Sequence, residues 1–173
     1  VVDIPVIGLA EASMAAAQMI GGRFAVVTIW PAYVPIMEKN LWLYGWEKRA
    51  IARRPIRYFD LDWSKLTAAI QGSSQDLLAD FERVALSCIE DGADVIIAGC
   101  GYLGPALSLL GYREVAQTKV PVVDCGAAGI VAAESMARLR KTIGLSPSRH
   151  QTSPDSRPPA KKLAAIRKRF GFE

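Results

Sequence analysis

The side chains best suited to acid/base chemistry in this sequence are three cysteines, Cys88, Cys100 and Cys125. Their number is odd and their spacing is wide, so they fit neither a disulfide framework nor the paired Cys-x-x-Cys pattern of a zinc site. A free thiol can remove a proton when it is ionised and return one when it is protonated. The position of each cysteine in the chain therefore decides what it can do.

Cys100 follows the apolar run 94–98 and lies between Gly99 and Gly101. Such a run is typical of a buried parallel strand, and sites in open α/β sheets lie outside the carboxyl ends of the strands. The flanking glycines let a substrate approach the backbone closely, and N–H groups near the start of the next helix favour anions, a thiolate included. The alternative is a small apolar residue that closes a strand, since free cysteine is commonly buried. Position alone leaves both interpretations open.

The elements that position this thiol follow from the pattern of the chain, in which β-rich runs alternate with helical patterns. This alternation predicts an α/β fold with a mostly parallel sheet covered by helices. The clearest helix is 74–91, where apolar residues recur every three or four positions, with Ser74 placed to cap its start and Gly92 to end it. Strands are predicted at 5–7, 24–29, 56–59, 94–98 and 120–124, and further helices near 11–20, 34–47, 105–117 and 127–142.

A short internal repeat predicts two duplicated lobes. Residues 4–7, with an Ala-rich helix after them, match residues 120–123, which are also followed by a helix of small residues. The strand before the second copy ends at Cys100, so its counterpart should end shortly before residue 1. The chain also has no initiator methionine. We therefore expect a fragment whose first lobe is incomplete.

Composition narrows the class of protein. The chain has 173 residues, of which 51% are hydrophobic and 22% charged, enough to bury a core. No apolar run has membrane-spanning length, and the free thiols favour the cytoplasm. The net charge of +4 comes from basic residues near the end, which predict a solvated surface rather than a nucleic-acid site; they are Lys161, Lys162, Arg167, Lys168 and Arg169.

Several segments resemble the Asp/Glu/hydantoin racemase superfamily in order along the chain. Gly92-Ala93-Asp94-Val95-Ile96 leading into Gly99-Cys100-Gly101 resembles its second-cysteine motif, and residues 120–124 with the following helix resemble what comes next. Residues 4–12 resemble the segment after the first-cysteine motif, and residues 23–28 the strand that opens the second lobe. The end of the chain, from Gly144, is similar to the C-terminal arm of hydantoin racemases.

The resemblance implies two pseudo-symmetric, Rossmann-like lobes with the active site in the cleft between them. It also implies a cofactor-independent and metal-independent racemisation of a small molecule, with a 5-substituted hydantoin favoured as substrate. Two thiols would remove and return the proton on opposite faces of the α-carbon, and Cys100 matches one of them. Its partner would lie upstream of residue 1, so residues 1–173 alone should be inactive.

Four more residues are candidates for the site in the same interpretation. Thr28, near a strand end, would offer its hydroxyl to a substrate oxygen, and Gly101 would let the substrate approach the backbone. Tyr102 departs from the small residue usual in the family, and it either walls the pocket or packs over a helix. Cys125 stands where the family more often has glycine, and it either borders the cleft or only closes a strand, whereas Cys88 lies on an apolar helix stripe and reads as structural.

Five aromatic residues between positions 30 and 46 form a cluster for which core or subunit contact is the default reading, and part of it can instead wall a pocket for an apolar substituent. They are Trp30, Tyr33, Trp42, Tyr44 and Trp46.

The expected organisation is a remnant of the first lobe at 1–21 and a second lobe at 22–119 that carries Cys100. A strand and helix at 120–143 would return to the first lobe, and a Pro-rich arm at 144–173, with a short basic helix near 160–169, would grip another subunit of a homo-oligomer. Arylmalonate decarboxylase, maleate cis–trans isomerase and a non-catalytic relative of the same fold stay open as alternatives.

Overall fold

The computed structural model describes residues 4–148 and 160–171. The chain divides into two compact units, one of residues 7–132 and one of residues 1–6 with 133–173. The larger unit contains the whole β-sheet and the three cysteines.

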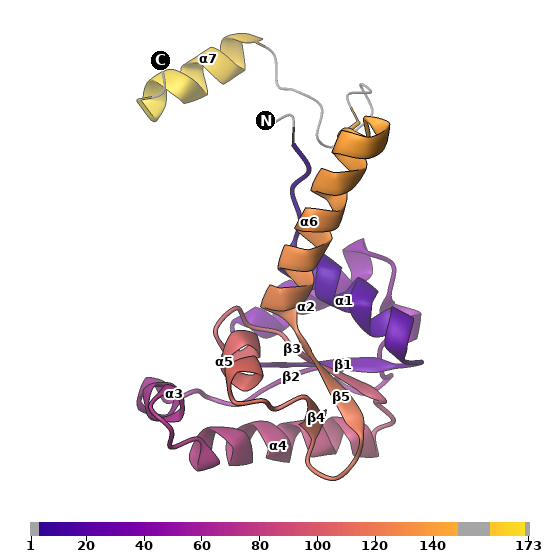
Figure 1. Cartoon of the computed structure of the whole chain (residues 1–173), viewed down its shortest axis with the longest axis vertical. Helices are drawn as coiled ribbons and strands as arrows, with labels where there is room; N and C mark the ends of the chain where they lie inside the picture. The colour runs from indigo at the N-terminus through magenta and orange to yellow at the C-terminus, as the bar shows by residue number, and fades with distance from the viewer. Residues whose placement is uncertain (1–3, 149–159, 172–173) are drawn as a thin grey trace. The chain divides into compact units, whose positions relative to one another are not determined.

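The sheet has five strands in the order β2-β1-β3-β5-β4 (Figure 1). Three pairings are parallel, and only β4 runs antiparallel, against β5. The predicted α/β class with a mostly parallel sheet is therefore confirmed. The strands are β1 (Phe24–Thr28), β2 (Ile56–Tyr58), β3 (Val95–Ala98), β4 (Glu114–Val115) and β5 (Val120–Asp124).

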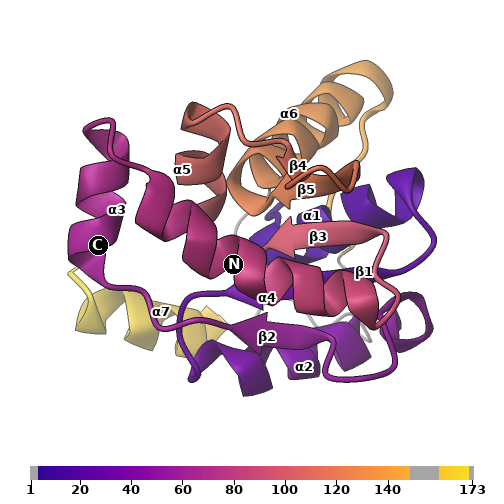
Figure 2. The same ribbon diagram turned by 90° about the horizontal axis from the view of Figure 1, so that it is seen from below.

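Helices cover both faces of this sheet, because successive strand residues point to opposite sides. Ala25 and Val27 of β1 belong to a core cluster with α3 (Trp63–Ile70), α4 (Gln75–Glu90) and α5 (Leu103–Leu109). Figure 2 shows α4 lying across this face of the sheet. Phe24 and Val26 belong to the cluster on the other face.

That other face is covered by α1 (Leu9–Ile20) and α2 (Tyr33–Leu43). Met14 and Ala17 of α1 are each 1% exposed and pack with Val26 and Ile97 of the sheet. The apolar face of α1 therefore packs on the sheet whose strand β3 precedes Cys100. That residues 1–21 are a remnant of a first lobe stays a prediction.

The segment 120–143 contains a strand and a helix, as expected, and its return to a first lobe stays a prediction. Its strand, β5, is hydrogen-bonded to β3, with Ala98 opposite Asp124. Its helix, α6 (Cys125–Ile143), has residues 125–132 in the larger unit and residues 133–143 in the smaller one. The predicted strand at 5–7 is wrong, because no described strand pairs with these residues.

Left-handed glycines explain where two helices end earlier than predicted. Gly45 (φ +70) and Gly111 (φ +71) follow α2 and α5 closely, so the expected helices 34–47 and 105–117 stop at Leu43 and Leu109. Helix α4 matches its prediction within one residue, and Gly92 (φ +96) follows it as expected. The Ser74 side chain makes no capping hydrogen bond, which corrects its predicted role.

The smaller unit contains α7 (Ala160–Arg169), which confirms the predicted basic helix. Most of the predicted Pro-rich arm, residues 149–159, lies outside the described residues. Of the helices in the described ranges, none combines the length and the apolar character that crossing a membrane requires.

Candidate active site

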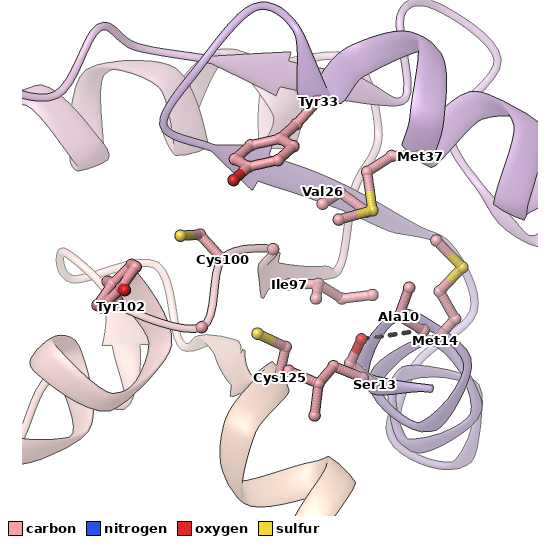
Figure 3. A pocket seen from close by; sticks show the side chains of 13 residues that line it. Ala10, Ser13, Met14, Val26, Tyr33, Met37, Ile97, Cys100, Tyr102 and Cys125 are labelled. Carbon is pink, nitrogen blue, oxygen red and sulfur yellow. Dashed lines mark hydrogen bonds between the residues drawn. The ribbon is translucent and has the colours of Figure 1, made fainter. Parts of the chain in front are cut away.

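A cavity of about 210 Å³ lies at the carboxyl ends of β1 and β3, on the side of the sheet covered by α1 and α2 (Figure 3). The site is therefore at the edge of a parallel sheet where α/β proteins bind ligands. Its lining residues come from α1, β1, α2, β3, the turn after β3 and the start of α6; they are Leu9, Ala10, Ser13, Met14, Val26, Tyr33, Met37, Ile97, Gly99, Cys100, Gly101, Tyr102 and Cys125.

Cys100 lines this cavity and is 8% exposed. It follows the last residue of β3 by two positions, and its carbonyl oxygen accepts a hydrogen bond of 3.0 Å from the Gly104 N–H in the first turn of α5. The structure thus positions the Cys100 thiol as predicted, at a strand end and on a concave surface. Its chemical role remains a proposal.

Gly99, directly after β3, lies close to the Val26 side chain of the neighbouring strand β1. A Cβ atom at Gly99 would lie 2.3 Å from Cγ1 of Val26, a distance that real Cβ atoms essentially never show. Both residues line the cavity, so the absence of a side chain at Gly99 fixes the sheet floor beside Cys100.

Cys125 is the first residue of α6, 3% exposed, and it lines the same cavity as Cys100. Burial, helped by the nearby Asp124 and Cys100, raises the pKa of the Cys125 thiol from 9.0 to about 11. Cys125 therefore contributes a neutral thiol to the cavity at neutral pH. The sequence left open whether it borders the cleft, and the structure answers that it lines the pocket.

Asp124 fixes the start of α6. One of its carboxylate oxygens accepts hydrogen bonds from the N–H groups of Gly126 (2.8 Å) and Ala127 (3.2 Å), which is N-cap geometry. The other oxygen accepts a hydrogen bond of 2.8 Å from the hydroxyl of Ser108 in α5. Asp124 thereby links the two helices that begin beside the cavity.

Gly101 and Tyr102 line the cavity as predicted for substrate-binding residues. Within the described residues, no group accepts a hydrogen bond from either of their backbone N–H groups. The Tyr102 side chain is 64% exposed and packs edge-on against Trp63 of α3, with ring centroids 5.4 Å apart. Both interpretations of Tyr102 therefore hold, since it walls the pocket and packs on a helix.

Thr28 does not line the cavity. It is 0% exposed at the end of β1, and its hydroxyl oxygen has no hydrogen-bond partner among the described residues. The strand alternation places it on the same face as Val26, which does line the cavity. Its predicted role in binding a substrate oxygen stays a prediction.

Cavity residues on α1 and α2 were missed from the sequence: Ser13, Met14 and Met37. The Ser13 hydroxyl donates a hydrogen bond of 3.0 Å to the Ala10 carbonyl oxygen in its own helix. Of the five aromatic residues noted between 30 and 46, only Tyr33 lines the cavity. The one sequence feature that pointed to α1 was its small residues. They predict that the helix packs closely against a neighbour, but they do not identify that neighbour.

The likeness of this chain to known proteins extends along most of its length. The family model described as Asp/Glu/hydantoin racemase matches residues 1–133. The chain therefore belongs to the Asp/Glu/hydantoin racemase family, as the residues around Cys100 indicated.

Two curated relatives are named hydantoin racemase. The chain is 34% identical to the one from Rhizobium meliloti over 148 residues, which is 86% of this chain and 56% of that protein. It is 32% identical to the one from Pseudomonas sp. (strain NS671) over 141 residues, which is 82% of this chain and 53% of that protein. The chain thus spans little more than half the length of these relatives.

Two solved structures share the fold. Both are titled allantoin racemase, one from Klebsiella pneumoniae with a TM-score of 0.68 and one from Pseudomonas fluorescens with a TM-score of 0.67. Each is 28% identical in sequence to this chain, of which 96% and 92% are covered. The chain covers 63% of each of those structures, so it corresponds to a part of them.

Proposed function

We propose that this chain is part of a cofactor-independent racemase that acts at the α-carbon of 5-substituted hydantoins, with Cys100 as one of two acid/base thiols. The observation that carries the proposal is the Cys100 thiol in a cavity at the carboxyl end of β3, in a chain of this family. Two relatives named hydantoin racemase support the substrate.

The cavity offers the functions that such a reaction needs. Removing the proton beside a carbonyl group leaves negative charge on the carbonyl oxygen, and N–H groups that already point at that position stabilise it. The N–H groups of Gly101 and Tyr102 have no other acceptor within the described residues and follow Cys100 directly. A substrate carbonyl bound there would hold its α-carbon beside the Cys100 thiol.

Racemisation also needs a second acid/base group on the opposite face of the α-carbon, because the proton is removed from one side and returned on the other. Cys125 follows the strand next to β3, so it shares a cavity edge with Cys100, and its raised pKa keeps it protonated. We propose that the second thiol comes from sequence outside residues 1–173, and that residues 1–173 alone do not racemise. The coverage of 53–56% of the relatives named hydantoin racemase supports this.

The test is exchange of the proton at carbon 5 of an enantiopure 5-substituted hydantoin in D₂O, followed by NMR and by chiral chromatography, with the uncatalysed rate subtracted. The full-length protein is compared with Cys100→Ser. Removing a positioned acid/base group is expected to slow exchange about 10²–10⁴-fold. Cys88→Ser is the matched control, because Cys88 lies in the core cluster of α4 and does not line the cavity.

Equal exchange rates for Cys100→Ser and the unmodified protein would show that Cys100 is not the acid/base group. Circular dichroism of each variant establishes that the fold is retained. Chiral chromatography separates racemisation from loss of a carboxyl group, since only racemisation yields the opposite enantiomer of the same compound.

A further inference from the structure

Two thiols line the same cavity. Figure 3 shows the sulfur atoms of Cys100 and Cys125 on the side of the pocket where Tyr102 lies. Cys100 is 8% exposed and Cys125 is 3% exposed, so the two thiols are reached through the cavity rather than from the outer surface. Cys88 is buried on α4 and does not line the cavity. The cavity therefore contains a pair of thiols, and the proposed function uses one of them.

The sheet brings the two cysteines close together. Their strands, β3 and β5, pair directly, with Ala98 opposite Asp124. Neighbouring strands lie about 4.8 Å apart. Cys100 follows Ala98 by two positions, and Cys125 follows Asp124 directly. Because each cysteine comes so soon after a paired residue, the spacing of the strands largely sets the separation of the two cysteines.

Gly104 lies against the backbone of both cysteines. Its N–H donates a hydrogen bond of 3.0 Å to the Cys100 carbonyl oxygen. A Cβ atom at Gly104 would lie 3.2 Å from the backbone nitrogen of Cys125 and 2.5 Å from a carboxylate oxygen of Asp124. A side chain at this position would therefore push the start of α6 away from the turn that carries Cys100. Gly104 keeps these two segments in contact.

One cysteine is held firmly, and the other lies in a turn that can adjust. Asp124 caps α6 and fixes its first residue, Cys125. Cys100 lies between Gly99 and Gly101, and glycine backbone rotates more freely than that of other residues. A disulfide requires two Cα atoms within about 4.4–6.8 Å of each other. The turn at Cys100 is the part that can supply any movement this geometry needs.

We propose that Cys100 and Cys125 form a dithiol modification site, which hydrogen peroxide converts into a disulfide and which small thiols reduce again. The disulfide stops proton transfer, because the Cys100 sulfur is then bonded to Cys125 and serves neither as an acid nor as a base. That consequence rests on the proposed function, whereas formation of the disulfide does not.

The reaction consumes one peroxide and releases two waters. The Cys100 thiolate attacks one peroxide oxygen, so that an S–O bond forms and the O–O bond breaks. The leaving hydroxide takes up the proton that Cys100 released, and a sulfenic acid remains. The Cys125 sulfur then attacks the sulfenic sulfur, the S–S bond forms and the S–O bond breaks, and the hydroxide leaves as water with the Cys125 proton. The two thiols lose two electrons, which the peroxide gains.

The surroundings of the two thiols set the order of these steps. The cavity of about 210 Å³ is several times the roughly 30 Å³ that a water molecule occupies, so a peroxide molecule fits beside Cys100. Burial, together with Asp124 and Cys100, raises the pKa of Cys125, so this thiol stays protonated at neutral pH and reacts slowly with peroxide itself. Its attack on a sulfenic acid in the same cavity is intramolecular, and proximity offsets the small thiolate fraction.

The test is peptide mapping of the reduced full-length protein after treatment with hydrogen peroxide, with the remaining thiols blocked by N-ethylmaleimide in urea. Trypsin and Glu-C together separate Cys88 from Cys100, because Glu90 lies between them. The expected product is a linked pair of peptides that carry Cys100 and Cys125. Its mass is about 2 Da below the sum of the two reduced peptides, and dithiothreitol separates the pair. Cys88 is expected to be blocked as in the untreated protein.

Cys125→Ser removes the second sulfur and keeps a side chain of similar size. Cys100 is then expected to remain a sulfenic acid, which dimedone traps, and to proceed to the irreversible sulfinic acid. After peroxide and then dithiothreitol, the unmodified protein is expected to regain nearly all of its untreated rate of hydantoin exchange. Cys125→Ser is expected to regain only a small part of its own untreated rate. Cys88→Ser is the matched control and should form the linked peptides as the unmodified protein does.

The peptide map and the exchange assay separate this inference from the proposed function. The inference alone is overturned if peroxide leaves both thiols reduced, if Cys100 links to a cysteine other than Cys125, or if Cys100 of the unmodified protein stays a sulfenic or sulfinic acid. If the linked peptides form but no hydantoin exchanges faster than in buffer, the proposed function falls and the dithiol site stands.

Discussion

Cys100 and Cys125 follow two neighbouring parallel strands, β3 and β5, and line one cavity. The register places Ala98 opposite Asp124, so each cysteine comes within two residues of a paired position. The two thiols lie at one edge of the sheet but in different local structures. Cys100 lies in a turn between two glycines, and Cys125 lies in the first turn of a helix that Asp124 caps.

The Cys125 thiol is expected to react slowly with iodoacetamide at pH 8, because only the thiolate reacts and burial raises its pKa to about 11. Its rate should rise about tenfold for each pH unit up to that value, since the thiolate fraction rises tenfold. Peptide mapping by mass spectrometry follows the reaction. The unfolded chain in urea serves as the reference, and labelling of Cys125 at pH 8 as fast as in urea would contradict the expectation.

Gly99→Ala is expected to destabilise the fold by about 1–3 kcal/mol, the usual cost of overpacking a core. The new methyl carbon would lie 2.3 Å from Cγ1 of Val26, which is far closer than van der Waals contact. Val26→Ala removes that atom, so the double variant should be more stable than the sum of the two single effects predicts. Urea unfolding of all four proteins gives the coupling energy, and strict additivity would show that Val26 is not the obstacle.

Asp124→Ala is expected to lower the free energy of unfolding by about 1–2 kcal/mol, because the N–H groups of Gly126 and Ala127 lose their cap. Asp124→Asn keeps an acceptor oxygen and should cost less. Ser108→Ala removes only the hydroxyl that donates to Asp124, with an expected loss of about 1 kcal/mol. Urea unfolding midpoints rank the three variants, and an equal cost for Asp124→Ala and Asp124→Asn would exclude a capping role.

Cys88 makes stability depend on alkaline pH. Burial raises its thiol pKa from 9.0 in the unfolded chain to about 11 in the fold. A group with a raised pKa in the folded state favours folding fully below pH 9 and loses that contribution between pH 9 and 11. From pH 8 to pH 10.5 the protein should therefore lose on the order of 1–2 kcal/mol more than Cys88→Ala does.

The comparison in that experiment is the change with pH within each protein, measured by urea unfolding at both pH values. The packing cost of Cys88→Ala cancels in the difference, and so does the ionisation of other groups. Equal losses for the two proteins would show that Cys88 does not ionise on unfolding.

The position of Cys100 could be predicted because two local signals agree there. A buried apolar run forms β3, and Gly99 and Gly101 mark the turn that follows it. Helix α4 was predicted for a similar reason, since its apolar stripe is long and regular. The early ends of α2 and α5 depend on Gly45 and Gly111, whose left-handed backbone was not recognised as a stop.

The rest of the site depends on tertiary packing that no local pattern encodes. Met14 and Met37 reach the cavity because α1 and α2 both cover one face of the sheet. They precede Cys125 by 111 and 88 positions, so no local motif joins them to it. Thr28 lies at the end of β1 as predicted, but it is fully buried and is not among the residues that line the cavity. Alternation along a strand predicts which face of the sheet a side chain points to, but not whether that side chain reaches a cavity on that face.

The close contact between Gly99 and Val26 also decides how this pocket can be redesigned. The sheet floor has no space for a larger side chain, because the backbone at Gly99 already lies against the Val26 side chain of the neighbouring strand. The helical wall is made of flexible, unbranched side chains that accept replacement. An engineer who wants the protein to accept bulkier molecules should therefore build the library at positions 14 and 37 and leave the strands as they are.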